Sequence, residues 1–147
     1  FEQRFPRGRL TAQETTLIQQ FRWDWEMGQA AGVQSGELFQ SNGSTAWTVA
    51  YEDTRWFQPS CLNRVVRVVP VDDLSDLGAV LEPVRCYLQT AGVAISEERL
   101  PGLVSHLSMV GVSRVCPVGQ MQHPPATWHH DGQPNLLNLV SWVDWES

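Results

Sequence analysis

A valine-rich segment, Arg64-Val65-Val66-Arg67-Val68-Val69-Pro70-Val71, constrains the fold more than any other part of the chain. Valine favours strands, and valines at nearly every position indicate burial on both faces, as in a parallel sheet covered by helices. Aromatic and β-branched residues predict a second strand over residues 46–51 and a third over residues 112–118. Residues 86–95 predict another strand, interrupted near Gly92.

Helical patterns alternate with these strands. Thr11-Ala12-Gln13-Glu14 is a capping box, in which the threonine hydroxyl binds the third helical amide and the glutamate reaches back. The apolar residues that follow recur on one helical face, and Gly32 ends the pattern. Asp72-Asp73 caps the second helix, and Gly111 ends the third. We expect helices over residues 12–31, 74–81, 96–109 and 136–145.

The alternation of strands and helices predicts an α/β fold: a layered, mostly parallel sheet with helices on both faces and the Val65–Val71 strand at its centre. The 147 residues suit a single unit, 1–147. Residues 1–10 are expected to form an extended lead-in, and residues 36–45 a loop. Because the chain begins with Phe1 rather than Met, we expect a fragment or a processed piece.

Composition narrows the function classes. A net charge of −6 argues against nucleic acid, whose phosphates require a basic surface. All ten basic residues are arginine, which excludes a Schiff-base or P-loop lysine from this chain. Three cysteines without CxxC spacing predict no disulfide framework and a cytoplasmic location. We expect no membrane span, because no apolar run approaches the roughly 20 residues that one needs.

The chemistry-bearing residues concentrate in residues 120–132, which hold three of the four histidines, a tryptophan and an Asp-Gly turn. A loop of this composition is more typical of a site than of a connection. His123, His129, His130 and Asp131, with Cys116, could ligate a metal, but no pair has the usual ligand spacing. We therefore expect no metal here. Asp131-Gly132 is typical of a turn.

Four segments in natural order resemble one enzyme family. They are residues 62–73, residues 87–93, residues 111–119 and the Trp128-His129-His130-Asp131-Gly132 stretch with its tail. The family is the bacterial luminescence-type long-chain acyl-CoA (acyl-protein thioester) reductases, a branch of the aldehyde dehydrogenase superfamily. Ordinary members of that superfamily carry Glu-x-Phe-Gly-Pro where this chain has Ser60-Cys61-Leu62-Asn63-Arg64, so their ribose-binding glutamate is absent here.

The resemblance implies part of an aldehyde-dehydrogenase-like catalytic domain. It also implies an NADPH-dependent reductase that converts acyl-CoA or acyl-protein thioesters to fatty aldehydes through a cysteine acyl-enzyme. The family's nucleophile and glycine-rich cofactor segment lie upstream of everything in this chain. We therefore expect the C-terminal portion of the enzyme, inactive by itself and without a catalytic residue.

The resemblance places the C-terminal loop at the mouth of the acyl tunnel, which makes Trp128, His129 and His130 candidate substrate-binding residues. The alternative is a loop that locks the last helix by polar contacts. Among the cysteines, Cys61 is the candidate nucleophile, because it follows a turn and lies near Arg55 and Arg64, whose charges would lower the thiol pKa. Cys86 and Cys116 fall in predicted strands, where a thiol is usually inert.

Two further sets of residues leave alternatives open. Arg55, Arg64 and Arg67 could contact the phosphates of CoA or NADPH, or form the solvated face of a strand. The tail around Trp142 and Trp145 suits core or subunit packing, and we expect a homo-oligomer or an assembly with partner subunits. The second functional hypothesis is a non-catalytic α/β interaction or assembly module with a tryptophan-rich partner surface.

Overall fold

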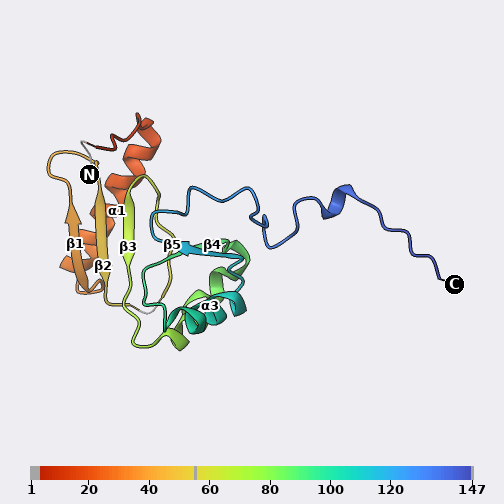
Figure 1. The fold of residues 1–147 in the computed structure, drawn as a ribbon. Coiled ribbons are helices and arrows are strands. Elements are labelled where there is room, and N and C mark those ends of the chain that lie inside the picture. The colour runs from red at the N-terminus through yellow and green to blue at the C-terminus, as the bar shows by residue number, and fades with distance from the viewer. Residues whose placement is uncertain (1–3, 55, 147) are drawn as a thin grey trace. The chain divides into compact units, whose positions relative to one another are not determined.

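The computed structural model describes residues 4–54 and 56–146 (Figure 1). The sequence predicts a single unit, and within the chain the internal contacts form two compact units, Phe1–Val71 and Asp72–Ser147. Unit 1 denotes the first of these and unit 2 the second. The fold is mixed α/β, with three α-helices and two small sheets in the part of the chain that is described.

Unit 1 begins with the predicted helix, α1 (Ala12–Ala30). The capping box is confirmed: Thr11 Oγ1 accepts a hydrogen bond from the Glu14 amide at 3.2 Å, and Glu14 Oε2 accepts one from the Thr11 amide at 2.7 Å. Ile18 and Trp25 are the buried residues of this helix. Gly32, at φ 70°, follows the C-cap, as the sequence predicts.

The helix lies along a three-stranded sheet in the order β1-β2-β3, formed by β1 (Gly36–Gln40), β2 (Thr48–Glu52) and β3 (Val65–Val68) (Figure 1). Strand β1 runs antiparallel to β2, and β3 runs parallel to it. The expected loop at residues 36–45 is thus wrong in its first half. Gly36, at φ 118°, approaches the Tyr51 carbonyl so closely that no Cβ would fit. Glycine is therefore required where β1 starts.

The prediction of a central, doubly covered Val65–Val71 strand is also wrong. Among the described residues β3 stands at the edge of a mixed sheet, and of its valines only Val65 is buried. Val66 is 50% exposed and Val68 is 40% exposed. Two physical features explain the difference. Arg67 interrupts the apolar run, and Pro70 has no amide hydrogen to continue the ladder, which confines proline to edge strands and strand ends.

Unit 2 contains a parallel pair, β4 (Thr90–Val93) and β5 (Arg114–Pro117), joined through α3 (Leu100–Met109). Before this strand pair comes the predicted capped helix, which consists of a 3-10 turn, η1 (Leu74–Asp76), and α2 (Leu77–Leu81). Asp73 Oδ1 accepts a hydrogen bond from the Ser75 amide at 2.8 Å, which confirms Asp73 as the N-cap of this helix. Leu103, Leu107, Val110 and Val112 form the buried core of this unit.

Two predicted elements of unit 2 are shorter than expected. The strand predicted at residues 86–95 is only β4, because residues 82–87 form a 3-10 helix, η2 (Glu82–Tyr87), after Pro83. The helix predicted from residue 96 begins at Leu100, with Pro101 in its first turn. Proline suits that position because it has no amide hydrogen to leave unbonded. Gly111, at φ 98°, follows α3 as predicted.

The predicted C-terminal helix over residues 136–145 is wrong. A single 3-10 turn, η3 (Leu137–Leu139), is all that forms, and residues 140–146 have no regular structure. Trp142, Val143 and Trp145 are 78%, 92% and 90% exposed, so the tail has no apolar contact that would stabilise a helix. In residues 4–54 and 56–146 no helix is long and apolar enough to cross a membrane.

Candidate functional site

A buried arginine organises the loop after β5. Arg114 lies on β5 and is 9% exposed. Its guanidinium donates hydrogen bonds to three loop carbonyls: Nη1 to Met121 at 2.8 Å, and Nη2 to Gln120 at 2.9 Å and to His123 at 3.5 Å. A guanidinium presents five donors in a fixed plane, so one side chain can fix several carbonyls at once. Arg114 therefore holds the start of the loop against the sheet.

The same guanidinium supports an aromatic cluster. Arg114 Cζ lies 5.6 Å from the centroid of the Trp128 ring, within range of a cation–π contact. The Trp128 and His130 rings lie 5.0 Å apart at an angle of 47°. Trp128 is half-buried, and its Nε1 has no hydrogen-bond acceptor among the described residues. That N–H is itself buried, so the part of the indole that a ligand can meet is the exposed part of its apolar ring.

Asp131 ties the far end of the loop to Gln89, the residue before β4. Gln89 Nε2 donates to Asp131 Oδ1 at 2.6 Å, and His130 Nδ1 lies 2.9 Å from Asp131 Oδ2. The hydrogen bond from Gln89, and then His130, hold the pKa of Asp131 below its usual value. Asp131 and Gly132 have φ of 52° and 73°, so the predicted Asp-Gly turn is confirmed. The carboxylate also anchors the loop, which the turn prediction did not include.

The loop brings together only part of the predicted set. Trp128 and His130 are in contact, whereas His129 and His123 are exposed and make no side-chain hydrogen bond within the described ranges. Of the residues that the structure describes, no three histidine, cysteine or acidic side chains gather closely enough to hold a metal. The loop geometry is thus that of an aromatic and polar surface.

An apolar cavity of about 290 Å³ lies beside the parallel pair in unit 2. Residues 93–95, residues 115–117, Leu100 and Val104 line it, and Cys116 is among them. Met121 of the loop packs against Gly92 of β4. The packing is so close that a Cβ added to Gly92 would lie 2.7 Å from the Met121 sulfur. Sequence reasoning missed this cavity. The small residues Ala91 and Gly92 of β4 are the signal that could have indicated open space beside these strands.

The cysteines differ from the sequence-based expectation. Cys61 was expected to be the most exposed thiol with a lowered pKa, but it is half-buried, and burial raises its pKa although the charge of Arg67 acts in the opposite direction. Cys86, expected in a strand, is exposed on η2. Cys116 does lie in a strand and is half-buried. Arg55, the other expected neighbour of Cys61, lies outside the described residues.

Arg67 of β3 and Arg64, which directly precedes that strand, serve the structure of unit 1. Arg67 Nη2 lies 2.8 Å from Glu52 Oε1, its Nε donates to Glu52 Oε2 at 3.0 Å, and its guanidinium stacks 5.5 Å from the Phe21 centroid. Glu52 is fully buried, so this ion pair neutralises a charge inside the unit. Arg64 donates to the Phe5 carbonyl. Both side chains are therefore engaged within the fold instead of forming a free phosphate-binding face.

The comparison with known families decides the identity of the chain. A family model described as acyl-CoA reductase (LuxC) matches residues 1–142. The match covers unit 1 and most of unit 2, including residues 118–132, the loop after β5 that is called the aromatic loop below. The chain belongs to the acyl-CoA reductase (LuxC) family. The resemblance stated from the sequence is confirmed, and membership in the LuxC family assigns the chain to the reduction of fatty acyl groups. No curated protein matches the chain.

Proposed function

We propose that the chain is the C-terminal portion of an NADPH-dependent reductase that converts long-chain acyl thioesters to fatty aldehydes through a cysteine acyl-enzyme. The family match over residues 1–142 carries this proposal. An upstream cysteine thiolate attacks the thioester carbonyl and expels the thiol of CoA or of an acyl protein. NADPH, when bound, would supply the hydride that reduces the enzyme-bound acyl group, and departure of the cysteine thiolate would then release the aldehyde.

The contribution of this chain is on the acyl side of the reaction. Trp128 offers an apolar ring face, and Arg114 holds both the ring and the start of the loop. We infer that Trp128 and His130 border the entrance for the acyl thioester, with His129 as an exposed neighbour. Residues 60–64 offer no carboxylate for a nicotinamide ribose, so we assign the nicotinamide contacts to the upstream segment.

The test compares the chain with the complete protein that contains it. We expect the complete protein to oxidise NADPH when long-chain acyl-CoA is added and to form the aldehyde, and the chain alone to do neither. Turnover by the chain alone that disappears in Cys61→Ala would move the nucleophile into this chain. Absence of aldehyde from the complete protein with both CoA and carrier-protein thioesters would overturn the proposal.

A second candidate function is an assembly module. It is favoured by the exposed apolar tail, in which Trp142, Val143 and Trp145 are each more than three-quarters exposed. Exposed side chains of this kind are typical of a surface that a partner covers. The molecular mass of the chain in solution, compared with that of a chain ending at residue 140, tests this function. Equal monomeric masses at all concentrations would exclude self-assembly through the tail.

A further inference from the structure

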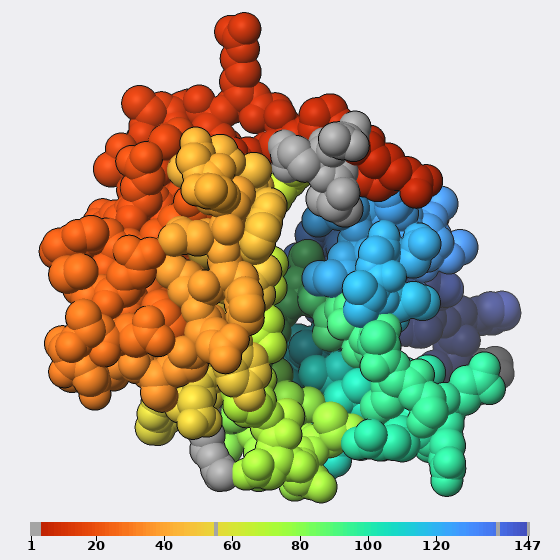
Figure 2. Space-filling model, turned by 90° about the vertical axis from the view of Figure 1, so that its left-hand side faces the viewer, coloured from red at the N-terminus to blue at the C-terminus, as the bar shows by residue number. Residues whose placement is uncertain are grey.

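Unit 1 contains a polar cavity that has no role in the acyl chemistry proposed above. It has a volume of about 850 Å³ and is lined by Arg7, by Thr15, Gln19 and Arg22 of α1, and by residues 40–46 between β1 and β2. Figure 2 shows the light-orange segment of residues 41–46 beside the red N-terminal segment. Among the described residues that line it, the two arginines carry charge, and most of the others carry hydroxyl or amide groups.

Arg22 is fixed in this cavity by four acceptors. Its Nε donates to Thr48 Oγ1 at 2.8 Å, Nη1 donates to the Ser44 carbonyl at 2.8 Å, and Nη2 donates to the Trp47 carbonyl at 2.8 Å and to Ser41 Oγ at 3.2 Å. All four acceptors are neutral, so these bonds orient the guanidinium without neutralising its charge. Burial lowers the pKa of Arg22, the nearby charge of Glu26 opposes this effect, and the charge of Arg7 adds to it.

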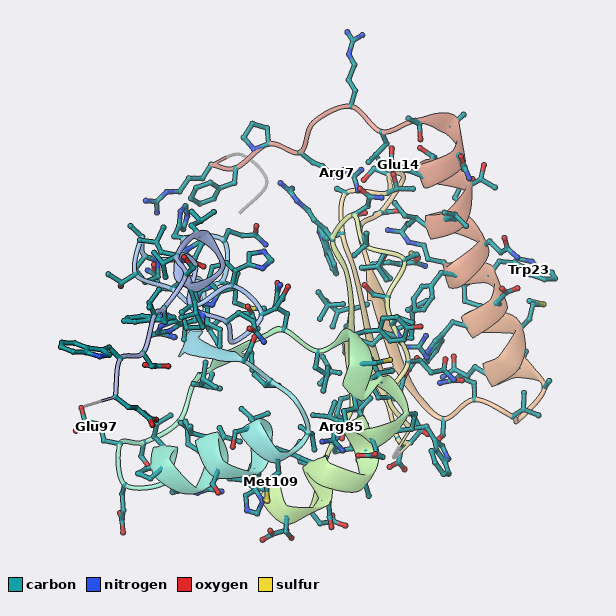
Figure 3. All side chains as sticks on the ribbon, turned by 90° about the vertical axis from the view of Figure 1, so that its right-hand side faces the viewer. Arg7, Glu14, Trp23, Arg85, Glu97 and Met109 are labelled. Atoms are coloured by element: carbon teal, nitrogen blue, oxygen red, sulfur yellow. The ribbon has the colours of Figure 1, made fainter. Side chains whose placement is uncertain are left out.

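Arg7 brings a second positive charge to the same cavity. It donates to the carbonyls of Thr45 and Asn63 and to Thr45 Oγ1, again neutral acceptors. Figure 3 shows its side chain near Glu14 at the start of α1. Glu14 Oε2, however, accepts hydrogen bonds from the amide and the hydroxyl of Thr11 at 2.7 and 2.8 Å. That carboxylate is engaged by the capping box and does not line the cavity.

Further donors face no partner. The side-chain amides of Gln19 and Asn42 make no hydrogen bond with the residues that the structure describes, and both residues are exposed at the rim. Two guanidinium groups with hydroxyl and amide donors, and no carboxylate in the lining, form the donor set that a phosphate recognises. A carboxylate or a metal cation would use this set less well, because a cation needs acceptors and a carboxylate has fewer oxygens.

We propose that this cavity binds a phosphate monoester. In a reductase of acyl thioesters two molecules bring that group, since CoA and NADPH each carry a phosphate on the adenosine ribose. This choice of source rests on the proposed function, whereas the site itself does not. The binding arginines are then Arg7 and Arg22, which the fold brings to one cavity. Arg64 and Arg67, which are neighbours in the sequence, are not part of it.

In the first experiment inorganic phosphate is titrated into a solution of the chain, and calorimetry and amide NMR measure its binding. We expect saturable binding that shifts the amide signals of residues 41–46. Arg7→Gln should weaken binding by about tenfold, the loss of one or more charge-assisted hydrogen bonds. Arg9→Gln removes the same charge from an exposed neighbour outside the cavity, so it should bind like the wild type. Circular dichroism checks that both variants fold.

Asn42→Ala provides a second variant that alters the rim without removing a charge, and we expect it to weaken phosphate binding by about threefold through loss of a neutral hydrogen bond. No binding of phosphate, or equal affinities in the wild type, Arg7→Gln and Asn42→Ala, would overturn the site. Equal losses in Arg7→Gln and Arg9→Gln would also overturn it, because they would indicate a nonspecific charge effect.

The second experiment identifies the source of the phosphate. CoA is compared with dephospho-CoA, and NADPH with NADH, by titration into the wild type and Arg7→Gln. If the wild type but not Arg7→Gln binds CoA more tightly than dephospho-CoA, the phosphate that the cavity binds is that of the acyl donor. If the wild type but not Arg7→Gln binds NADPH more tightly than NADH, the phosphate is that of the reductant. Phosphate binding with no preference in either pair would support the site and overturn its link to the reductase. A complete protein that reduces acyl-CoA without any phosphate binding here would overturn this inference alone.

Discussion

An arginine that binds main-chain carbonyls organises a loop in each unit, but the two loops differ in what surrounds the arginine. Arg114 in unit 2 is buried under Trp128, and its loop presents aromatic rings. Arg22 in unit 1 lies in an open cavity among hydroxyls with Arg7 as a second charge. The same guanidinium group can therefore hold an apolar surface in place in one unit and contribute to a charged surface in the other. The neighbours of the arginine decide which, so substitutions in the two loops should have different effects.

The largest expected effect is on stability, from Arg114→Met. It removes three hydrogen bonds to loop carbonyls and the contact with Trp128, and we expect a loss of about 3 kcal/mol in the free energy of unfolding. Denaturant unfolding measures the change. Arg99→Met is the control, because Arg99 is exposed in the same unit. Equal losses in the two variants would show that Arg114 does not hold the loop.

Next in size is the effect of Trp128→Ala on the complete enzyme. Loss of the indole face should raise the KM for long-chain acyl-CoA by about tenfold, since burial of a large aromatic surface contributes this much or more. The KM for NADPH should not change. His130→Ala should have a smaller effect of the same kind, and His129→Ala the smallest, because His129 lies outside the ring contact. Unchanged kinetics with only a lower melting temperature would make the loop a packing element.

Gly92→Ala tests how the aromatic loop is attached to β4. The new Cβ would lie 2.7 Å from the Met121 sulfur, which is the end of a flexible side chain, so we expect a cost of about 1 kcal/mol. Gly102→Ala in α3 is the control. It meets open space and should stabilise the chain by about 0.5 kcal/mol. If Met121→Ala does not relieve the cost of Gly92→Ala, the contact between them is not its cause.

The smallest effect concerns pH. In the folded chain the pKa of Asp131 lies below the usual aspartate value of 3.8, so its stabilising contribution is present above 3.8 and is lost as the pH falls through the lowered pKa. We expect the indole N–H NMR signal of Trp128 to move in this acidic range in the wild type and to stay constant in Asp131→Asn. Glu14→Gln should leave the transition unchanged, because Glu14 serves the cap of α1. A transition that persists in Asp131→Asn would assign it to another carboxylate.

Local rules predicted the elements whose determinants are close in sequence. The capping box of α1 and the Asp73 cap need only residues two or three positions apart, so both were confirmed. The Asp131-Gly132 turn followed for the same reason. The family could also be recognised, because its segments keep their order along the chain.

The strands β2 and β5 were expected from the sequence and form, but which strands pair with one another was not predictable. Strand β1 exists through its pairing with β2 across the sheet, and β3 stands at an edge because only β2 pairs with it among the described residues. The C-terminal helix failed for the converse reason, since its apolar side chains find no packing partner. Hydrophobic pattern indicates which residues can be buried, but the contacts decide which are.

The sequence by itself determined the family, the caps, the turns and the concentration of aromatic and histidine residues after β5, because each depends on residue type and short spacing. Only the tertiary structure decided which residues act together. Arg114 with Trp128, Gln89 with Asp131, and Arg7 with Arg22 are separated by 14, 42 and 15 positions in the sequence. A guanidinium or carboxylate becomes a binding group or an anchor according to the acceptors and donors that folding brings within about 3 Å of it, and that distance is set by the fold.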